Sequence, residues 1–514
     1  MDKIDYENQF KKKTIKEYME LSSEQQLAFD KYVQGHNIFI TGPGGTGKSA
    51  LIKMIYKHAY EHFKDIQVTA LTGCAAVLLN CKAKTLHSWA HIGLGNGTIE
   101  QLVTKIKKNK FAKTLWKCTD VLVVDEVSML SLKLFTLLNE IGKVIRGNQK
   151  PFGGIQLVFS GDFFQLPPVG DYLEPDTQRF CFESDDWNSV FHRDCQIQLI
   201  KIFRQTDDTY AAILNQIREG KIRRKSNDLL LRYVGRTFSE NLVAEPTKLF
   251  PTRNKVENIN NTKMSALVGD AKGFSIRYAK DLEMTKTERT IRCDFSEKDI
   301  QIELDFLAGN LICDKELTLK IGSQVMCVIN IQTDYGMEIC NGSQGIVTGF
   351  CEVTSCPQVK FNNGIIRTME RHVWVSDKIP GIGVSQVPLI LAWALTIHKS
   401  QGATMDAAEI DVGSGIFECG QTYVALSRVK SLDGLYLTSF DATRIRINKK
   451  VKEFYESLAL YHNTKETNKE VYIPVTIAEP ISQENIFSSY QYANAGEAEI
   501  PLEIPMVDVK IIHL

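Results

Sequence analysis

A glycine-rich segment at residues 42–49 carries the residues best suited to chemistry in this 514-residue chain. It reads GPGGTGKS, follows the apolar run 37–41 and precedes the helical pattern 50–55. Glycines let the backbone N–H groups of such a loop turn towards phosphate oxygens, and the start of the following helix favours their negative charge. The lysine can reach the outer phosphates of a nucleoside triphosphate, and the serine hydroxyl can bind Mg²⁺. The segment therefore predicts a nucleoside triphosphate site, with contacts from Gly42, Gly44, Gly45, Thr46, Gly47, Lys48, Ser49 and Ala50.

Asp125 and Glu126 are adjacent carboxylates that directly follow the apolar run 121–124. A continuous apolar run is typical of a strand that is buried on both faces of a parallel sheet. Ligands of such sheets bind at the carboxyl ends of the strands, so we expect both acids to lie beside the glycine-rich loop. There Asp125 could hold Mg²⁺, and Glu126 could polarise an attacking water molecule.

Three other polar side chains are candidates for the same site. Gln165 follows a second apolar strand pattern and is placed to sense the outermost phosphate. Arg204 follows a third apolar run and could stabilise charge that develops during phosphoryl transfer, although an isolated arginine is more often a surface ion-pair partner. Gln25 lies in an amphipathic segment, 21–29, that begins with a helix-capping serine. It could contact the adenine edge of the nucleotide, or it could be part of a plain solvated helix.

The elements that must position these residues alternate between strand and helix patterns. Apolar runs lead into helical patterns from residue 38 to about 205, and helices are expected at 131–146 and 210–218. This alternation predicts a parallel α/β sheet, and the pattern resumes at 389–395. Between 263 and 387, short alternating strands and two Asn-Gly pairs predict a small, barrel-like, all-β insertion.

We expect these patterns to divide the chain into five parts. The parts are an N-terminal extension (1–20), a first α/β lobe (21–205), a second lobe (206–262 and 388–463), the insertion within it (263–387) and a C-terminal extension or tail (464–514).

Composition restricts the ways in which the chain could contact a polyanion. The 61 basic and 61 acidic residues give a net charge of zero, so any nucleic-acid surface must be local. Residues 101–117 include six lysines and no acid, which fits either a solvated face or an electrostatic contact with a single strand. Thr85 and His87 lie in a segment whose hydroxyls and rings could contact phosphates and bases, or could pack in a core.

Cysteine usage and the N-terminus indicate the compartment. The twelve cysteines are scattered without a Cys-x-x-Cys pair, which is typical of reduced thiols. The first sixteen residues lack the apolar core of a secretory signal, and no apolar run approaches membrane-spanning length. We therefore expect a soluble intracellular protein with no membrane partner, and nucleus, cytoplasm and viral factory all stay open.

Taken in order, these segments resemble a known family. The stretches 154–168, 395–402 and 423–428, together with the glycine-rich loop and the acid pair, are similar to the motifs of the Pif-type (petite integration frequency) DNA helicases of superfamily 1B, relatives of RecD and Dda. The resemblance extends from about residue 21 to 458. It implies an α/β fold with two RecA-like P-loop NTPase lobes, a small 1B wedge insertion near 92–118 and an SH3-like 2B insertion.

The resemblance also implies roles for individual residues. Arg204 and Arg428 would act as arginine fingers from opposite sides of a nucleotide bound between the lobes. Gln25 would lie at the adenine, and Gln401 would belong to the nucleotide site. The positions where the family touches a DNA strand correspond to Thr85, His87, Thr396, His398 and Ser400.

The implied function is an ATP-dependent, 5′-to-3′ DNA helicase that uses ATP and Mg²⁺. It would translocate on single-stranded DNA and unwind forked or tailed duplexes in replication, recombination, repair or genome maintenance. Two alternatives stay open: a translocase or RNA-directed motor on the same scaffold, and a nucleotide-gated DNA-binding module. Glu126 and the two candidate arginine fingers argue against the binding module, because binding alone needs neither.

Overall fold

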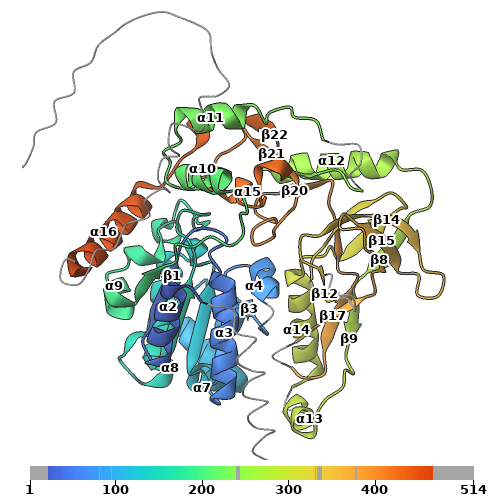
Figure 1. Ribbon diagram of the computed structural model, residues 1–514. Helices are drawn as coiled ribbons and strands as arrows, with labels where there is room; N and C mark the ends of the chain where they lie inside the picture. The colour runs from blue at the N-terminus through green and yellow to red at the C-terminus, as the bar shows by residue number, and fades with distance from the viewer. Residues whose placement is uncertain are drawn as a thin grey trace, which may run out of the picture. The chain divides into compact units, whose positions relative to one another are not determined.

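The computed structural model describes residues 21–79, 81–93, 95–238, 243–293, 295–329, 331–332, 338–376 and 379–466. Its first lobe, coloured from blue to teal in Figure 1, is built on a six-stranded parallel sheet with the order β3-β2-β4-β5-β1-β6. The strands β1 and β4 are buried along their whole length, as expected for continuous apolar runs in a covered parallel sheet. Only β5 separates them, so their carboxyl ends meet at one edge. The bounds are β1 (Ile38–Thr41), β2 (Ile66–Ala70), β3 (Lys84–Thr85), β4 (Val121–Asp125), β5 (Gln156–Ser160) and β6 (Gln196–Gln198).

Helices pack around this sheet. The predicted helix 131–146 is confirmed as α8, with Ser131 as its N-cap and Gly147 in the left-handed conformation at its end. Ser22 caps the first described helix through a reciprocal pair of hydrogen bonds with Gln25. The helices of this lobe are α2 (Ser23–Val33), α3 (Lys48–Glu61), α4 (Gly73–Leu79), α5 (Leu86–Ala90), α6 (Ile99–Lys108), α7 (Lys110–Cys118), α8 (Leu132–Arg146) and α9 (Trp187–Val190).

The predicted wedge region, 92–118, consists mainly of α6 and α7. The apolar faces of both helices join the core of the first lobe. The indole N–H of Trp116 donates to the Ala90 carbonyl at 3.1 Å, and the rings of Trp116 and Trp89 are 4.4 Å apart. All six lysines of residues 101–117 are exposed on the opposite faces. Exposed lysines fit both a solvated face and an electrostatic contact with a single strand, and the role of region 92–118 as a wedge stays a prediction.

The second lobe contains a four-stranded parallel sheet with the order β20-β7-β21-β22. The predicted helix 210–218 is confirmed as α10, and its buried face packs with α15 and the sheet in a second core. The bounds are β7 (Thr247–Phe250), β20 (Ala394–Thr396), β21 (Ala408–Val412), β22 (Leu435–Phe440), α10 (Asp208–Arg218), α11 (Arg224–Leu231), α12 (Arg253–Ala266) and α15 (Gln421–Leu426).

The insertion consists largely of short antiparallel strands, as predicted, but it is not purely β. It also contains α13 (Lys286–Arg292) and α14 (Glu297–Asn310), which the alternating pattern did not indicate. Ser296 caps α14, and Ile300, Leu304 and Ala308 form a buried stripe at helical spacing. The main sheet has the order β16-β15-β14-β11-β19, with bounds β11 (Gln324–Cys327), β14 (Gln344–Phe350), β15 (Pro357–Phe361), β16 (Ile366–Thr368) and β19 (Leu389–Leu391). The strand β19 lies beyond the predicted boundary at residue 387 but pairs with β11, so the sheet of the insertion extends past that boundary. The smaller strands are β8 (Lys272–Ser275), β9 (Arg277–Ala279), β10 (Glu316–Leu319), β12 (Ile331–Gln332), β13 (Glu338–Ile339), β17 (His372–Val375) and β18 (Gly383–Gln386).

The last described helix, α16 (Lys449–Glu466), follows the second sheet in sequence but packs on the first lobe. Val451, Tyr455 and Leu458 are buried in the core that also holds the aromatic residues of that lobe. The chain therefore passes from the first lobe to the second and returns. None of the described helices combines the length and the apolar character needed to cross a bilayer.

Candidate functional site

The loop between β1 and α3 has the geometry of a phosphate cradle. Gly45 and Gly47 adopt left-handed backbone angles, with φ of 88° and 81°. A side chain at either position would also collide with a neighbour, because a Cβ would lie 2.5 Å from Arg204 Cβ at Gly45 and 2.5 Å from Gln25 Nε2 at Gly47. The glycines are thus required both by the turn and by the close approach of other segments.

A cavity of about 420 Å³ opens over this loop, within the usual size range of small-molecule sites. It brings together most of the residues predicted for the nucleotide site. Those that line it are Gly44, Gly45, Gly47, Lys48, Ser49, Ala50, Asp125, Glu126, Gln165, Arg204 and Arg428.

Four other residues predicted to contact the nucleotide do not line the cavity but lie against residues that do. They are Gln25, Gly42, Thr46 and Gln401. Gln25 donates from Nε2 to the Thr46 carbonyl at 3.2 Å, and Gln401 donates to Glu126. The carbonyl of Gly42 accepts from the ammonium group of Lys48 at 2.7 Å. Gln25 is 4% exposed and its side-chain oxygen accepts from the backbone of its own helix cap, so both ends of its amide are engaged.

Lys48 is the cation at the centre of the loop. Its ammonium group donates to the carbonyls of Gly42 and Pro43, at 2.7 and 2.9 Å, and one of its three protons is left for another acceptor. Burial lowers the pKa of Lys48, while the carboxylates of Asp162 and Glu126 oppose that shift. The group is thus a cation poised among carboxylates and loop carbonyls, and phosphate oxygens are suitable acceptors for it.

The two carboxylates occupy the end of β4, as predicted. Asp125 is buried, and burial raises its pKa. Glu126 has a φ of 56°, a left-handed angle that is uncommon outside glycine and is found where surrounding structure fixes a side chain for function. Gln401 donates to Glu126 Oε2 at 3.1 Å. Burial and then the negative charge of Asp125 raise the pKa of Glu126 to about 7, so this carboxylate suits a general base near neutral pH.

The two candidate arginine fingers face the cavity from different segments. Arg428, which is 2% exposed, donates to the Val424 carbonyl at 2.8 Å and to the Ser427 hydroxyl at 2.8 Å. Burial and then the nearby Arg204 guanidinium lower the pKa of Arg428 to about 9, which leaves it cationic at neutral pH. Arg204 donates to the Ser427 carbonyl at 3.3 Å. Two positive groups therefore converge where negative charge would develop during phosphoryl transfer.

Gln165 contributes an unpaired polar atom. Its side chain is 6% exposed, and its Oε1 has no hydrogen-bond partner among the described residues. A buried amide oxygen without a donor is costly, so its position at the cavity fits a group that receives a donor when the site is filled. A water molecule or a hydroxyl would serve as that donor.

The residues predicted to contact DNA lie at the carboxyl ends of strands in both lobes. Thr85 ends β3 and His87 lies in α5, and the two residues line different cavities. Thr396 ends β20, His398 follows that strand, and both residues are half-buried. Burial lowers the pKa of both histidines, so they are neutral at physiological pH. Ser400 is fully buried, and its hydroxyl donates to the Ile397 carbonyl at 2.9 Å.

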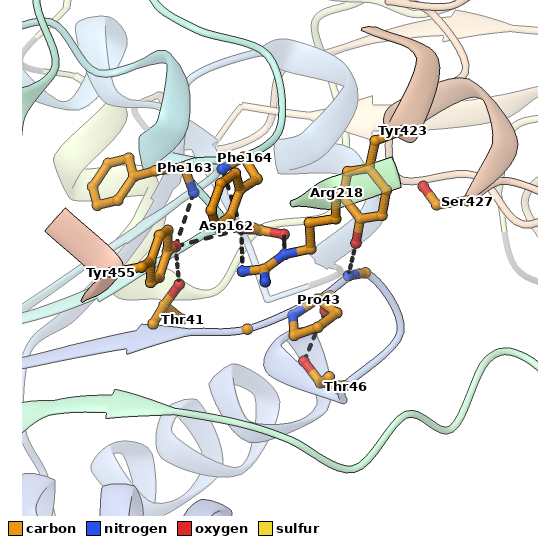
Figure 2. Close-up of polar contacts among 12 residues, drawn as sticks. Thr41, Pro43, Thr46, Asp162, Phe163, Phe164, Arg218, Tyr423, Ser427 and Tyr455 are labelled. Carbon is orange, nitrogen blue, oxygen red and sulfur yellow. Dashed lines mark hydrogen bonds and ion pairs between the residues drawn. The ribbon is translucent and has the colours of Figure 1, made fainter. Parts of the chain in front are cut away.

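Sequence reasoning missed three residues around the loop. The Tyr423 hydroxyl accepts a hydrogen bond from the backbone N–H of Gly44, and Asp162 pairs with Arg218 (Figure 2). Tyr423 and Asp162 both lie inside quoted motifs, five residues before Arg428 and three before Gln165. Arg218 lies outside them, at the end of α10, and only the tertiary structure indicates its importance.

Known proteins resemble this chain in sequence and in structure. A family profile described as "PIF1-like helicase" matches residues 20–228, and one described as "DNA helicase Pif1, 2B domain" matches residues 304–350. The ATP-dependent DNA helicase PIF1 of Emericella nidulans is 36% identical over 83% of this chain and 61% of its own length. The ATP-dependent DNA helicase RRM3 of Saccharomyces cerevisiae is 33% identical over 85% of this chain and 68% of its own length. This chain therefore spans only about two thirds of the length of these relatives.

A solved structure agrees with these sequence relatives. The crystal structure of the Pif1 helicase from Candida albicans is 35% identical, covers 86% of this chain and 100% of its own, and has a TM-score of 0.67. The likeness confirms the predicted α/β fold with two RecA-like lobes and a 2B insertion. The chain belongs to the PIF1-like helicase family.

Proposed function

We propose that this protein is an ATP-dependent DNA helicase that translocates 5′ to 3′ on single-stranded DNA and unwinds forked or tailed duplexes. The observation that carries the proposal is the convergence of Lys48, Glu126 and Arg428 on one cavity, with residues of both lobes in its lining. A site that only binds nucleotide has no need of a buried base with a pKa near 7 or of two arginines. This favours hydrolysis over a nucleotide-gated binding module.

Solved structures of related helicases support nucleotide and DNA as the ligands. A Bacteroides Pif1 solved with ADP-AlF4 is 27% identical with a TM-score of 0.68, and another bound to single-stranded DNA is 28% identical with a TM-score of 0.56. A third neighbour, 27% identical with a TM-score of 0.58, is described as unwinding forked double-stranded DNA. Nucleotide, single strand and fork are thus the ligands we assign to this chain.

Five side chains of the cavity have roles in the proposed hydrolysis. Lys48 and the loop N–H groups bind the phosphates, and Glu126 accepts a proton from the attacking water. Gln165 orients that water through its unpaired Oε1, while Arg204 and Arg428 stabilise the charge that develops on the transferred phosphoryl group.

Mg²⁺ fits the same site. Ser49 and Asp125 both line the cavity, and they are a hydroxyl and a carboxylate, the oxygen ligands that this ion takes. The described residues hold no cluster of three or more His, Cys, Asp or Glu, so the remaining ligands would be phosphate oxygens and water, as is usual for this ion beside nucleotides. When bound, Mg²⁺ would neutralise phosphate charge.

The proposed coupling to DNA rests on the residues that are predicted to contact the strand. Thr85 and His87 belong to the first lobe, and Thr396, His398 and Ser400 belong to the second. A nucleotide that binds the closed arrangement of the lobes more tightly than the open one shifts the protein towards the closed arrangement. This shift moves the strand-contacting residues of one lobe relative to those of the other. Cycles of binding and hydrolysis then bias movement along the strand.

ATP hydrolysis by wild type and Glu126→Gln, measured with and without single-stranded DNA, tests the proposal. We expect DNA to stimulate hydrolysis by the wild type and the variant to lose hydrolysis while it still binds ATP. Equal stimulation by RNA would indicate an RNA-directed motor instead. A wild type that binds ATP without strand-stimulated hydrolysis would indicate a binding module.

A further inference from the structure

A buried ion pair joins the two lobes beside the nucleotide cavity. Arg218, at the end of α10 in the second lobe, donates from Nε and Nη2 to the two carboxylate oxygens of Asp162 in the first lobe, both at 2.8 Å. Arg218 is 5% exposed and Asp162 is fully buried. The paired, planar geometry fixes the orientation of both groups (Figure 2).

Asp162 in turn shapes the backbone that carries Gln165. Its Oδ1 accepts from the backbone N–H of Phe164 at 3.2 Å, and its carbonyl accepts from the backbone N–H of Gln165 at 2.9 Å. The carboxylate held by Arg218 is therefore part of the turn that places the unpaired Gln165 Oε1 at the cavity. A shift of Arg218 relative to the first lobe would shift that turn.

The helix α16 completes the cluster through Tyr455. The Tyr455 ring stacks on Phe164 with centroids 4.8 Å apart and planes at 11°, and the Arg218 guanidinium lies 4.5 Å from the Phe164 centroid. The Tyr455 hydroxyl bonds to Thr41 Oγ1 at 2.5 Å and accepts from the Phe163 N–H at 3.1 Å. Because Thr41 is the last residue of β1, the cluster touches the strand that leads into the phosphate loop (Figure 2).

Stability alone does not explain this arrangement. Burying two charges costs desolvation that their attraction only about offsets, so well-packed apolar residues would stabilise the lobe contact as well or better. A buried ion pair does fix the relative position of its two groups. This is important at a contact between two lobes that move relative to each other during the proposed cycle.

We propose that Arg218 is a positioning residue that acts through Asp162 on Gln165, so that the rate of hydrolysis depends on the arrangement of the second lobe. The inference rests on the proposed ATP hydrolysis and adds to it the route by which one lobe acts on the chemistry of the other. Arg218 itself does not line the cavity, and the turn that Asp162 holds connects it to Gln165.

A double-mutant cycle tests the route. DNA-stimulated hydrolysis is measured for wild type, Arg218→Lys, Gln165→Ala and the double variant, with single-turnover reactions for the slow ones. Arg218→Lys keeps the charge but loses the paired geometry, and we expect it to lower kcat about tenfold with a change in KM below about threefold. In the Gln165→Ala background, the same change should lower kcat by less than about twofold. If Arg218→Lys lowers kcat by the same factor in the wild type and in the Gln165→Ala background, the proposal is overturned.

Arg236→Lys is the matched control. Arg236 also lies close to two aromatic rings, 5.3 Å from the Tyr233 centroid and 4.8 Å from the Tyr436 centroid, but it donates to Leu432 and Leu435 carbonyls within the second lobe. We expect it to leave kcat unchanged. An equal loss of kcat in this variant would show a general effect of disturbing a stacked arginine, and would overturn the positioning role.

Circular dichroism establishes whether Arg218→Lys folds. If it does not, Asp162→Asn takes its place in the cycle, because it keeps the size of the side chain and removes the charge that pairs with Arg218. A kcat equal to that of wild type in this variant would then overturn the proposal. Failure of the proposed function looks different: the wild type itself would not hydrolyse ATP.

Discussion

The hydroxyl of Tyr423 accepts a hydrogen bond from the backbone N–H of Gly44, with 2.7 Å between oxygen and nitrogen. Tyr423 belongs to α15 of the second lobe, and Gly44 lines the nucleotide cavity in the first. The Tyr423 hydroxyl oxygen is thus hydrogen-bonded to a backbone N–H group of the phosphate loop. Any phosphate oxygen that uses this N–H must displace it.

Tyr423→Phe should therefore strengthen ATP binding. The variant leaves the Gly44 N–H without its partner in the free protein, and a net hydrogen bond of ~1 kcal/mol corresponds to about a fivefold lower Kd. Titration with a fluorescent ATP analogue measures the change. Tyr210→Phe is the control, because its hydroxyl donates to the Leu426 carbonyl at 2.7 Å and does not touch the loop. Weaker binding by Tyr423→Phe would show that the hydroxyl helps to hold the nucleotide.

Hydrolysis should rise with pH through about pH 7. Glu126 must be ionised to accept a proton from water, and burial together with Asp125 raises its pKa to about 7. Below that pH the carboxyl group is protonated and inactive, and above it the carboxylate is available. The pH profile of kcat/KM for ATP reports this group in the free enzyme.

Gln401→Leu should move that pH profile to higher pH. The Gln401 amide donates to the Glu126 carboxylate and lowers its pKa, so its removal favours the protonated form. A profile that stays flat across neutral pH in the wild type, or a shift to lower pH in the variant, would exclude Glu126 as the base.

Lys48→Ala should abolish hydrolysis, with a loss of at least about a hundredfold in kcat/KM. The change removes the only lysine in the loop 42–49, whose ammonium group binds the phosphates in the proposed site. Steady-state hydrolysis measures the effect. Lys53→Ala, on the exposed face of the same helix, should leave the rate unchanged. Near-normal turnover in Lys48→Ala would refute the assignment of the loop.

Arg428→Lys should spare ATP binding and lower kcat about a hundredfold. Lysine keeps a positive charge in the buried position, whereas alanine would leave the Val424 carbonyl without its donor. A planar guanidinium can contact two oxygens of the developing charge, and an ammonium cannot do so with the same geometry. Binding and single-turnover hydrolysis separate the two effects. A loss of affinity with an unchanged rate of the chemical step would argue against a finger role.

The nucleotide site could be predicted because its signals are local. Lys48 follows a strand and opens a helix, and Asp125 and Glu126 end a continuous apolar run, so each residue carries its own structural context. The rule that ligands bind at the carboxyl ends of parallel strands then brings them together. The cavity lined by these residues agrees with that reasoning.

The contacts between lobes could not be predicted. Asp162 and Arg218 are 56 residues apart, and Tyr455 is 293 residues from Asp162, so no periodicity or spacing relates them. The packing of α16 on the first lobe could not be predicted either. The apolar stripe of this helix indicates a buried face, but it does not indicate which core that face joins. The helix α14 could not be predicted because the alternating patterns on both sides of it favour strands.

The central claim is that this chain converts ATP hydrolysis into 5′-to-3′ unwinding. The most direct measurement is ATP-dependent strand separation of two partial duplexes of equal stability, one with a 5′ single-stranded tail and one with a 3′ tail. We predict opening of the 5′-tailed duplex alone, and no opening by Glu126→Gln. Opening of the 3′-tailed duplex alone, or of neither substrate while single-stranded DNA still stimulates hydrolysis, would contradict the account.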